Sequence, residues 1–139
     1  MKAYITGKLS KKQPDFHLTN LWFAKDEVVD TDIPSIDCLG LSCDGFDCET
    51  IVNGNQFSSR WKEVYLTDVD EYGSAYQTRL FGIKQLILMI ERGDMYLRNI
   101  EAFAEGSVTV EITEIKLIDE EGSVILDKAL HSEPIEFID

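Results

Sequence analysis

The sequence predicts an α+β protein, with a largely antiparallel β-sheet and one main helical segment, at about residues 82–104, packed on a face of that sheet. Short segments with alternating apolar and polar residues, which are typical of strands, occur toward both ends of the chain. The middle contains the clearest helical spacing of apolar residues. Strands, then a helix, then strands favour an α+β fold, because a doubly wound parallel sheet needs repeated alternation of strands and helices.

The first half of the chain carries most of the expected strands. Extended patterns occur at residues 3–9, 16–23, 36–41, 48–52, 60–66 and 74–81. A short helix from Thr19 is an alternative for part of the second segment. Turns are expected at residues 43–46, 53–55 and 70–73, where glycine accepts a positive φ at little cost. Residues 26–34 are polar and acidic, so we expect a loop there.

The helical segment is predicted from apolar residues at a spacing close to 3.6. These residues are Ile83, Leu86, Ile87, Ile90 and Leu97. Gly93 and Asp94 interrupt the pattern, since glycine inside a helix costs up to about 1 kcal/mol. Either the helix kinks there, or Asp94 caps a second short helix that ends near Gly106.

The C-terminal third returns to β-structure. Alternating residues predict a long strand at 108–118, a tight turn at Glu121 and Gly122, and a returning strand at 123–126. Residues 134–138 are expected to add an edge strand, because proline is tolerated at the edge of a sheet.

Length and composition predict a single domain that spans residues 1–139. A chain of 139 residues with 44% apolar and 28% charged residues is typical of a globular protein that folds without a metal or disulfide. The sequence shows no signal-peptide pattern, and its longest apolar run is too short to span a bilayer. We therefore expect a cytoplasmic protein with reduced thiols.

The charge of the chain restricts its partners. Thirteen basic and 26 acidic residues give a net charge of -13. Residues 101–139 contain two bases and eleven acids, so this part alone carries -9. Such acidity argues against binding to nucleic acid or to an anionic membrane surface. It favours a basic protein partner, although a role in solubility alone also fits.

The acidic side chains of the C-terminal hairpin are the predicted partner-binding residues. They are Glu105, Glu111, Glu114, Asp119, Glu120, Glu121 and Asp127. A strand pair with an acidic face and an exposed edge suits docking to a basic surface. The alternative is an ordinary solvated face whose charges prevent edge-to-edge aggregation.

No catalytic, metal or cofactor site is predicted. The cysteines at 38, 43 and 48 do not have the spacing of a zinc finger, and His17 and His131 lie far from them in sequence. A zinc site from three cysteines and one histidine, or a Cys–His nucleophile, has no supporting motif. The acids around Asp44 lack the pattern of a calcium loop, and no phosphate-binding glycine loop occurs.

One region resembles a known kind of protein. It includes CETIVNG at 48–54, WKEVYL at 61–66, YQTRLFGI at 76–83 and QLILMI at 85–90. In this arrangement two strands are followed by a glycine and then by an amphipathic helix. The arrangement is similar to that of small uncharacterised bacterial proteins, some of them immunity-protein-like. The resemblance implies a protein without enzymatic activity that neutralises a cognate toxin.

The sequence thus leads to three hypotheses. The first is an immunity or inhibitor-type protein whose acidic surface covers a cationic toxin, such as a nuclease. The second is a bacterial or phage regulatory protein that binds or sequesters a small ligand between sheet and helix. The third is an enzyme without a recognisable motif.

Overall fold

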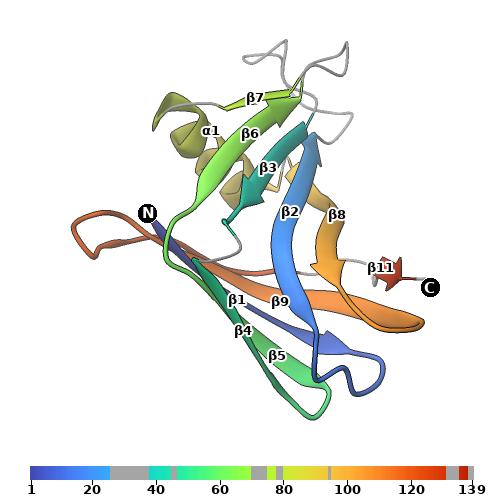
Figure 1. Cartoon of the computed structure of the whole chain (residues 1–139). Helices are drawn as coiled ribbons and strands as arrows, with labels where there is room; N and C mark the ends of the chain where they lie inside the picture. Colours follow the sequence, from blue (N-terminus) through green and yellow to red (C-terminus); the bar gives the residue numbers. More distant parts are fainter. Residues whose placement is uncertain are drawn as a thin grey trace.

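The computed structural model describes most of the chain. The described residues are 1–25, 38–44, 47–69, 75–77, 80–93, 95–130 and 135–137. Within this part the fold is built from two antiparallel sheets and a single short helix, as Figure 1 shows. The predicted α+β class with antiparallel pairing is therefore confirmed, but the strands form two sheets instead of one, and the short helix is not clearly packed on a face as expected.

The first sheet, sheet A, has the strand order β10-β9-β1-β5-β4, and β11 pairs with β9 beside this path. Its strands are β1 (Lys2–Leu9), β4 (Cys48–Asn53), β5 (Gln56–Trp61), β9 (Val108–Ile118), β10 (Val124–Ala129) and β11 (Ile135–Phe137). Buried and exposed residues alternate along β1 and β5, so one face of the sheet lies in the core and the other faces solvent.

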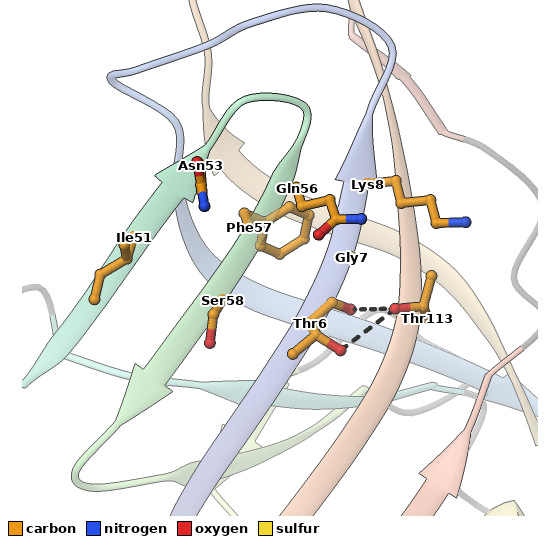
Figure 2. Close-up of a pocket in the computed structure, with 9 residues that line it drawn as sticks. All are labelled: Thr6, Gly7, Lys8, Ile51, Asn53, Gln56, Phe57, Ser58 and Thr113. Atoms are coloured by element: carbon orange, nitrogen blue, oxygen red, sulfur yellow. Dashed lines mark hydrogen bonds between the residues drawn. The ribbon is translucent and has the colours of Figure 1, made fainter.

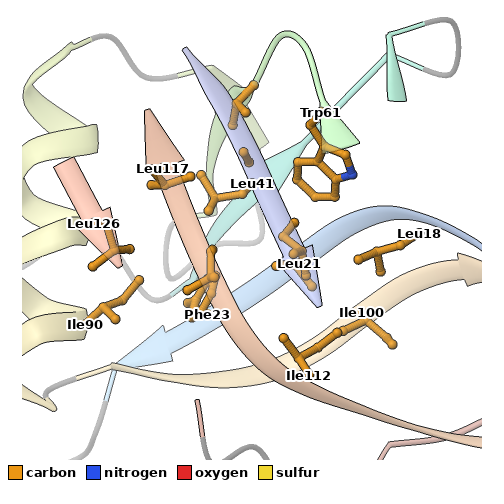
Figure 3. Packing of buried hydrophobic residues seen from close by; sticks show 14 of the residues in the cluster. Leu18, Leu21, Phe23, Leu41, Trp61, Ile90, Ile100, Ile112, Leu117 and Leu126 are labelled. Atoms are coloured by element: carbon orange, nitrogen blue, oxygen red, sulfur yellow. The ribbon is translucent and has the colours of Figure 1, made fainter. Parts of the chain in front are cut away.

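The second sheet, sheet B, has the order β7-β6-β3-β2-β8. Its strands are β2 (His17–Lys25), β3 (Cys38–Ser42), β6 (Tyr65–Val69), β7 (Ala75–Gln77) and β8 (Met95–Phe103). Leu18, Leu21 and Leu41 contribute side chains without exposed surface to the cluster between the sheets. Figure 3 shows that side chains from both sheets and from the helix meet in this core.

The helix is shorter than the sequence predicted. Helix α1 covers Leu80–Arg92 and ends at Gly93, whose φ of 80° lies in the left-handed region typical of helix ends. The expectation of a helix to residue 104 is wrong, because Met95–Phe103 forms β8 and pairs with β2. Leu97, which fitted the helical spacing, belongs to this strand, where pairing decides its conformation.

The strand expected at 60–66 is also wrong. The chain bends at Lys62 and Glu63, so β5 ends in sheet A and β6 begins in sheet B. The strand expected at 74–81 is shorter than predicted: β7 covers Ala75–Gln77, and α1 begins at Leu80. The loop predicted at 26–34 and the turn predicted at 70–73 lie outside the described residues.

Other local predictions are confirmed. Gly54 and Gly122 have φ values of 63° and 84° in the turns between β4 and β5 and between β9 and β10. The edge strand expected at residues 134–138 is present as β11, which pairs with β9.

A β-bulge shapes the middle of sheet A. The register between β1 and β9 shifts between Thr6 and Gly7. A Cβ atom at Gly7 would meet the Glu111 carbonyl oxygen and come within 2.5 Å of the Phe57 ring. Phe57 is buried and also contacts Phe16, with 4.7 Å between ring centres. Glycine is therefore required at position 7, because the aromatic ring occupies the space of a side chain.

Candidate functional site

The structure distributes the seven predicted partner-binding residues over three places. Glu111, Glu114 and Asp127 lie on strands of sheet A. Asp119, Glu120 and Glu121 lie in or beside the turn between β9 and β10. Glu105 lies in the connection between β8 and β9, at the opposite end of β9. The eleven residues of β9 span roughly 35 Å, so Glu105 is far from the other turn.

The solvent-exposed face of sheet A has no excess of acids among its described side chains. Glu111 lies opposite Lys8, Asp127 lies opposite Lys116, and Glu49 lies opposite Arg60. Four acidic and four basic side chains belong to this face: Glu49, Glu111, Glu114, Asp127, Lys2, Lys8, Arg60 and Lys116. Neighbouring opposite charges on adjacent strands compensate one another.

Tyr4 and Arg60 occupy the centre of that face. The guanidinium carbon of Arg60 lies 5.7 Å from the centre of the Tyr4 ring. A hydrogen bond from Arg60 and its positive charge lower the pKa of Tyr4 below the ordinary value, and Lys2 and Lys116 lower it further. Tyr4 in turn raises the pKa of Arg60. Three basic side chains of this face, Arg60, Lys2 and Lys116, therefore lower the pKa of one phenol group.

The turn between β9 and β10 gathers the acidic group that we call the acidic tip, defined as Glu63, Asp119, Glu120 and Glu121. The Asp119 carboxylate accepts hydrogen bonds from the backbone N–H groups of Glu121 and Ser123, at 3.0 and 2.8 Å. The amino group of Met1 lies 2.5 Å from Glu120 Oε1 and 3.8 Å from Glu63 Oε1. In Figure 1 this hairpin projects from the molecule beside the N-terminus.

Glu63 was missed by the sequence prediction. It belongs to the bend between β5 and β6, more than fifty positions from Asp119, and no local pattern connects the two. A small hollow of about 190 Å³ separates the segments, and Lys2 and Lys62 also line it. The acidic tip is thus bordered by two basic residues, and its members Glu63, Glu120 and Glu121 are exposed.

A larger hollow lies on the exposed face of sheet A, above Gly7 and Phe57. Figure 2 shows the polar side chains around it, and its volume is about 340 Å³. Its lining residues are Thr6, Gly7, Lys8, Ile51, Asn53, Gln56, Phe57, Ser58 and Thr113. Three hydroxyls, two amides and one ammonium group line it, without a carboxylate among these residues. Such groups can exchange hydrogen bonds with a small polar molecule.

Two of the residues that line the hollow, Thr6 and Thr113, are hydrogen-bonded to each other. The hydroxyl of Thr113 donates to the Thr6 carbonyl at 3.2 Å, and the two threonine hydroxyls lie 3.3 Å apart. Ile51 adds an aliphatic side chain that is 62% exposed. The second hypothesis expected a ligand pocket between sheet and helix, whereas this hollow lies on the opposite, solvent-facing side of sheet A.

A polar seam joins the two sheets where β2 approaches β4; we define it by His17, Cys43, Cys48, Thr50 and Ser59. The Cys48 sulfur lies 3.2 Å from Nε2 of His17. Thr50 accepts a hydrogen bond from the Leu18 N–H at 3.3 Å, and its hydroxyl lies 2.9 Å from that of Ser59. Trp61 also donates its indole N–H to Ser59, at 3.0 Å. The buried hydroxyls of this seam are therefore hydrogen-bonded.

Cys43 contacts β2 two residues beyond His17, at Thr19. Its N–H donates to the Thr19 carbonyl at 3.2 Å, and its sulfur lies 3.9 Å from that oxygen. Burial raises the pKa of the Cys43 thiol above its usual range, and a hydrogen bond with Cys48 raises it further. No group of three or more His, Cys, Asp and Glu side chains in the described ranges is arranged to hold a metal ion.

Comparison of the chain with protein-family models, curated proteins and solved structures gives no match. Among the described residues, no helix is long and apolar enough to cross a membrane. The acidic tip, the hollow and the polar seam are therefore the features from which a function is inferred.

Proposed function

We propose that the protein is a non-enzymatic binding protein of the immunity or inhibitor type, which engages a basic protein partner, such as a toxin domain, through the acidic tip. The observation that carries this proposal is the projecting β9–β10 hairpin, whose turn presents three consecutive carboxylates in a chain of net charge -13. A protein with this charge accelerates its encounter with a cationic surface, and charges at the first point of contact select the partner.

The backbone of the turn supports this role. Asp119 accepts two backbone hydrogen bonds within the turn, and the Gly122 N–H donates to the Asp119 carbonyl at 3.1 Å. These contacts fix the turn before a partner arrives, so binding costs little conformational entropy in the backbone. Glu63, Glu120 and Glu121 are exposed, and Glu121 and the Glu120 side chain, which also contacts the Met1 amino group, are the turn carboxylates that a basic partner would meet.

The acids on the face of sheet A have a different role in this proposal. Glu111 and Asp127 each lie opposite a lysine, and such compensated pairs contribute little to a long-range field. Glu105 lies at the far end of β9 and adds to the net charge without belonging to the same contact.

The test is a double substitution that changes charge only at the acidic tip. A partner captured at low salt should lose about tenfold in affinity for Glu120→Gln/Glu121→Gln. The control is Asp15→Asn/Glu91→Gln, which removes the same charge from exposed positions in the β1–β2 connection and on α1. Equal losses in both variants, or no partner at low salt, would contradict a contact at the tip.

A second candidate function is the binding of a small polar ligand, and the hollow above Gly7 favours it. Its hydroxyl, amide and ammonium groups suit a neutral or weakly anionic polar molecule of a size that fits about 340 Å³. Native mass spectrometry of freshly purified protein should then detect added mass that Ser58→Trp abolishes. Lys84→Trp, which adds the same side chain on α1, should retain it.

A further inference from the structure

Two cysteines and one histidine meet at the connection between the sheets. β3 ends at Ser42 and β4 begins at Cys48, so Cys43 and Cys48 lie at the two ends of the segment that joins sheet B to sheet A. Cys43 contacts Thr19 and Cys48 contacts His17. Positions 17 and 19 lie two residues apart on β2, a separation of roughly 7 Å, so both cysteines lie against the same short stretch of strand.

We propose that Cys43 and Cys48 form a peroxide-reactive dithiol that closes to an intramolecular disulfide, with His17 as the base that activates Cys48. The proposal is independent of the binding function above. It rests on the 3.2 Å contact between Cys48 and His17 and on the position of Cys43 beside them. A neutral imidazole nitrogen at this distance can accept the thiol proton near neutral pH.

The two thiols have different roles. Burial raises the pKa of Cys43, and the negative charges of Asp44 and Asp47 contribute in the same direction. Burial thus disfavours the thiolate of Cys43, whereas Cys48 has the imidazole of His17 within hydrogen-bonding distance. Because the thiolate is the nucleophile, Cys48 reacts first and Cys43 resolves the intermediate.

The reaction consumes one peroxide molecule. His17 Nε2 takes the proton from Cys48, the sulfur bonds to one peroxide oxygen, and the O–O bond breaks; the departing hydroxide takes the proton and leaves as water. Cys43 sulfur then bonds to Cys48 sulfur and the S–O bond breaks. The second hydroxide takes the Cys43 proton and also leaves as water. Two thiols are oxidised to a disulfide, and hydrogen peroxide is reduced to two waters.

The burial of the site selects the oxidant. Cys48 is only 8% exposed and Cys43 is half-buried. A small molecule such as hydrogen peroxide can reach this pair more readily than a bulky disulfide reagent, since reactivity depends on access as well as on thiolate character.

The experiment treats the full chain with hydrogen peroxide. The intact mass should fall by two hydrogens, and the number of free thiols should fall from three to one, since two of the three cysteines are consumed. Digestion on the amino side of aspartate cuts before Asp44 and Asp47 and so separates the two cysteines. The expected product links the peptide 37–43, which contains Cys38 and Cys43, to the peptide that begins at Asp47, and fragmentation of the linked pair should place the bond on Cys43.

Three variants assign the roles. Cys43→Ser should leave a sulfenic acid on Cys48 that dimedone traps, and Cys38→Ser should still form the disulfide. His17→Gln should slow the reaction at pH 7 about tenfold or more. Circular dichroism during heating shows whether each variant is folded. The peptide map of the wild type tests the proposal even if a variant does not fold.

Several outcomes would overturn the proposal. A disulfide that includes Cys38, a disulfide between two molecules, or a sulfenic acid that persists on Cys48 in the wild type would each show that Cys43 does not resolve it. An unchanged rate in folded His17→Gln would remove the histidine from the mechanism.

Discussion

The exposed face of sheet A and the acidic tip contain acids from the same part of the sequence in opposite electrostatic surroundings. On the face, Glu111 and Asp127 lie opposite lysines of neighbouring strands. At the tip, Asp119, Glu120 and Glu121 follow one another in a turn, where the Met1 amino group contacts Glu120 and where Lys2 and Lys62 border the group. Acids and bases are therefore equal in number on the face, whereas the four acids of the tip outnumber the three positive groups beside them.

The two regions also differ in what their charges do: those of the face keep the sheet solvated, whereas those of the tip can meet a partner. A face with four charges of each sign can be solvated without repelling itself, which suits a sheet that must stay folded in a strongly acidic chain. A projecting turn contributes less to the core, so it can carry like charges at lower cost to stability. Three substitutions test whether the two regions differ in this way.

The largest effect is expected for Gly7→Val in sheet A. The new side chain collides with the Glu111 carbonyl and the Phe57 ring, and overpacking of this kind costs about 3 kcal/mol. The free energy of unfolding from urea titration measures it. Ser58→Val, at an exposed position of β5, is the control and should change stability by less than about 0.5 kcal/mol. Similar stabilities for both variants would mean that Phe57 does not require the glycine.

A smaller loss is expected for Asp119→Ala at the tip. The substitution removes the acceptor of the Glu121 and Ser123 N–H groups and should cost about 1 kcal/mol, because the donors are exposed and water can replace the acceptor. Asp119→Asn keeps an acceptor oxygen and should retain most of the stability. Urea unfolding compares the two, and amide chemical shifts of residues 121 and 123 show whether the turn opens. If the alanine and asparagine variants unfold at the same urea concentration, the carboxylate is not an acceptor in the turn.

The smallest effect concerns the centre of the charged face. Arg60→Gln removes the hydrogen bond and charge that lower the pKa of Tyr4, so this pKa should rise toward the ordinary value. Absorbance of the phenolate during alkaline titration measures it, and Tyr4→Phe identifies which transition belongs to Tyr4. A lowered pKa favours the folded state only at alkaline pH, once the phenol ionises, so stability at pH 7 should not depend on it. An unchanged Tyr4 titration would show that Arg60 does not act on the phenol.

Local patterns predicted much of the fold. The strand at 108–118 and the turns at Gly54 and Gly122 follow from alternation and from glycine in tight turns, which depend on neighbours in sequence. The helix boundary failed because Met95 and Leu97 continue the apolar spacing of α1 but pair with β2. The pairing of β8 with β2, about seventy residues earlier in the chain, cannot be recognised from the residues near β8.

The candidate site was harder to predict. The sequence predicted one acidic group on the C-terminal hairpin, whereas the structure places its seven residues in three regions. It also missed that Glu63 lies beside Asp119 and Glu120, since the bend at Lys62 was expected to be strand. Cys48 and His17 are separated by 31 positions and meet only because β2 and β4 approach each other. Their spacing matches no motif, so only the three-dimensional arrangement brings them together.

Gln13 has a consequence for how the molecule opens. This buried amide accepts a hydrogen bond from the Glu105 N–H at 2.9 Å and donates one to the Glu105 carbonyl at 2.5 Å. The Gln13 side chain thereby makes the two hydrogen bonds that a residue of a neighbouring strand would make. These bonds connect the β1–β2 connection to the β8–β9 connection. We therefore expect these two segments to open together, and the Glu105 amide to exchange its hydrogen with solvent only when they do.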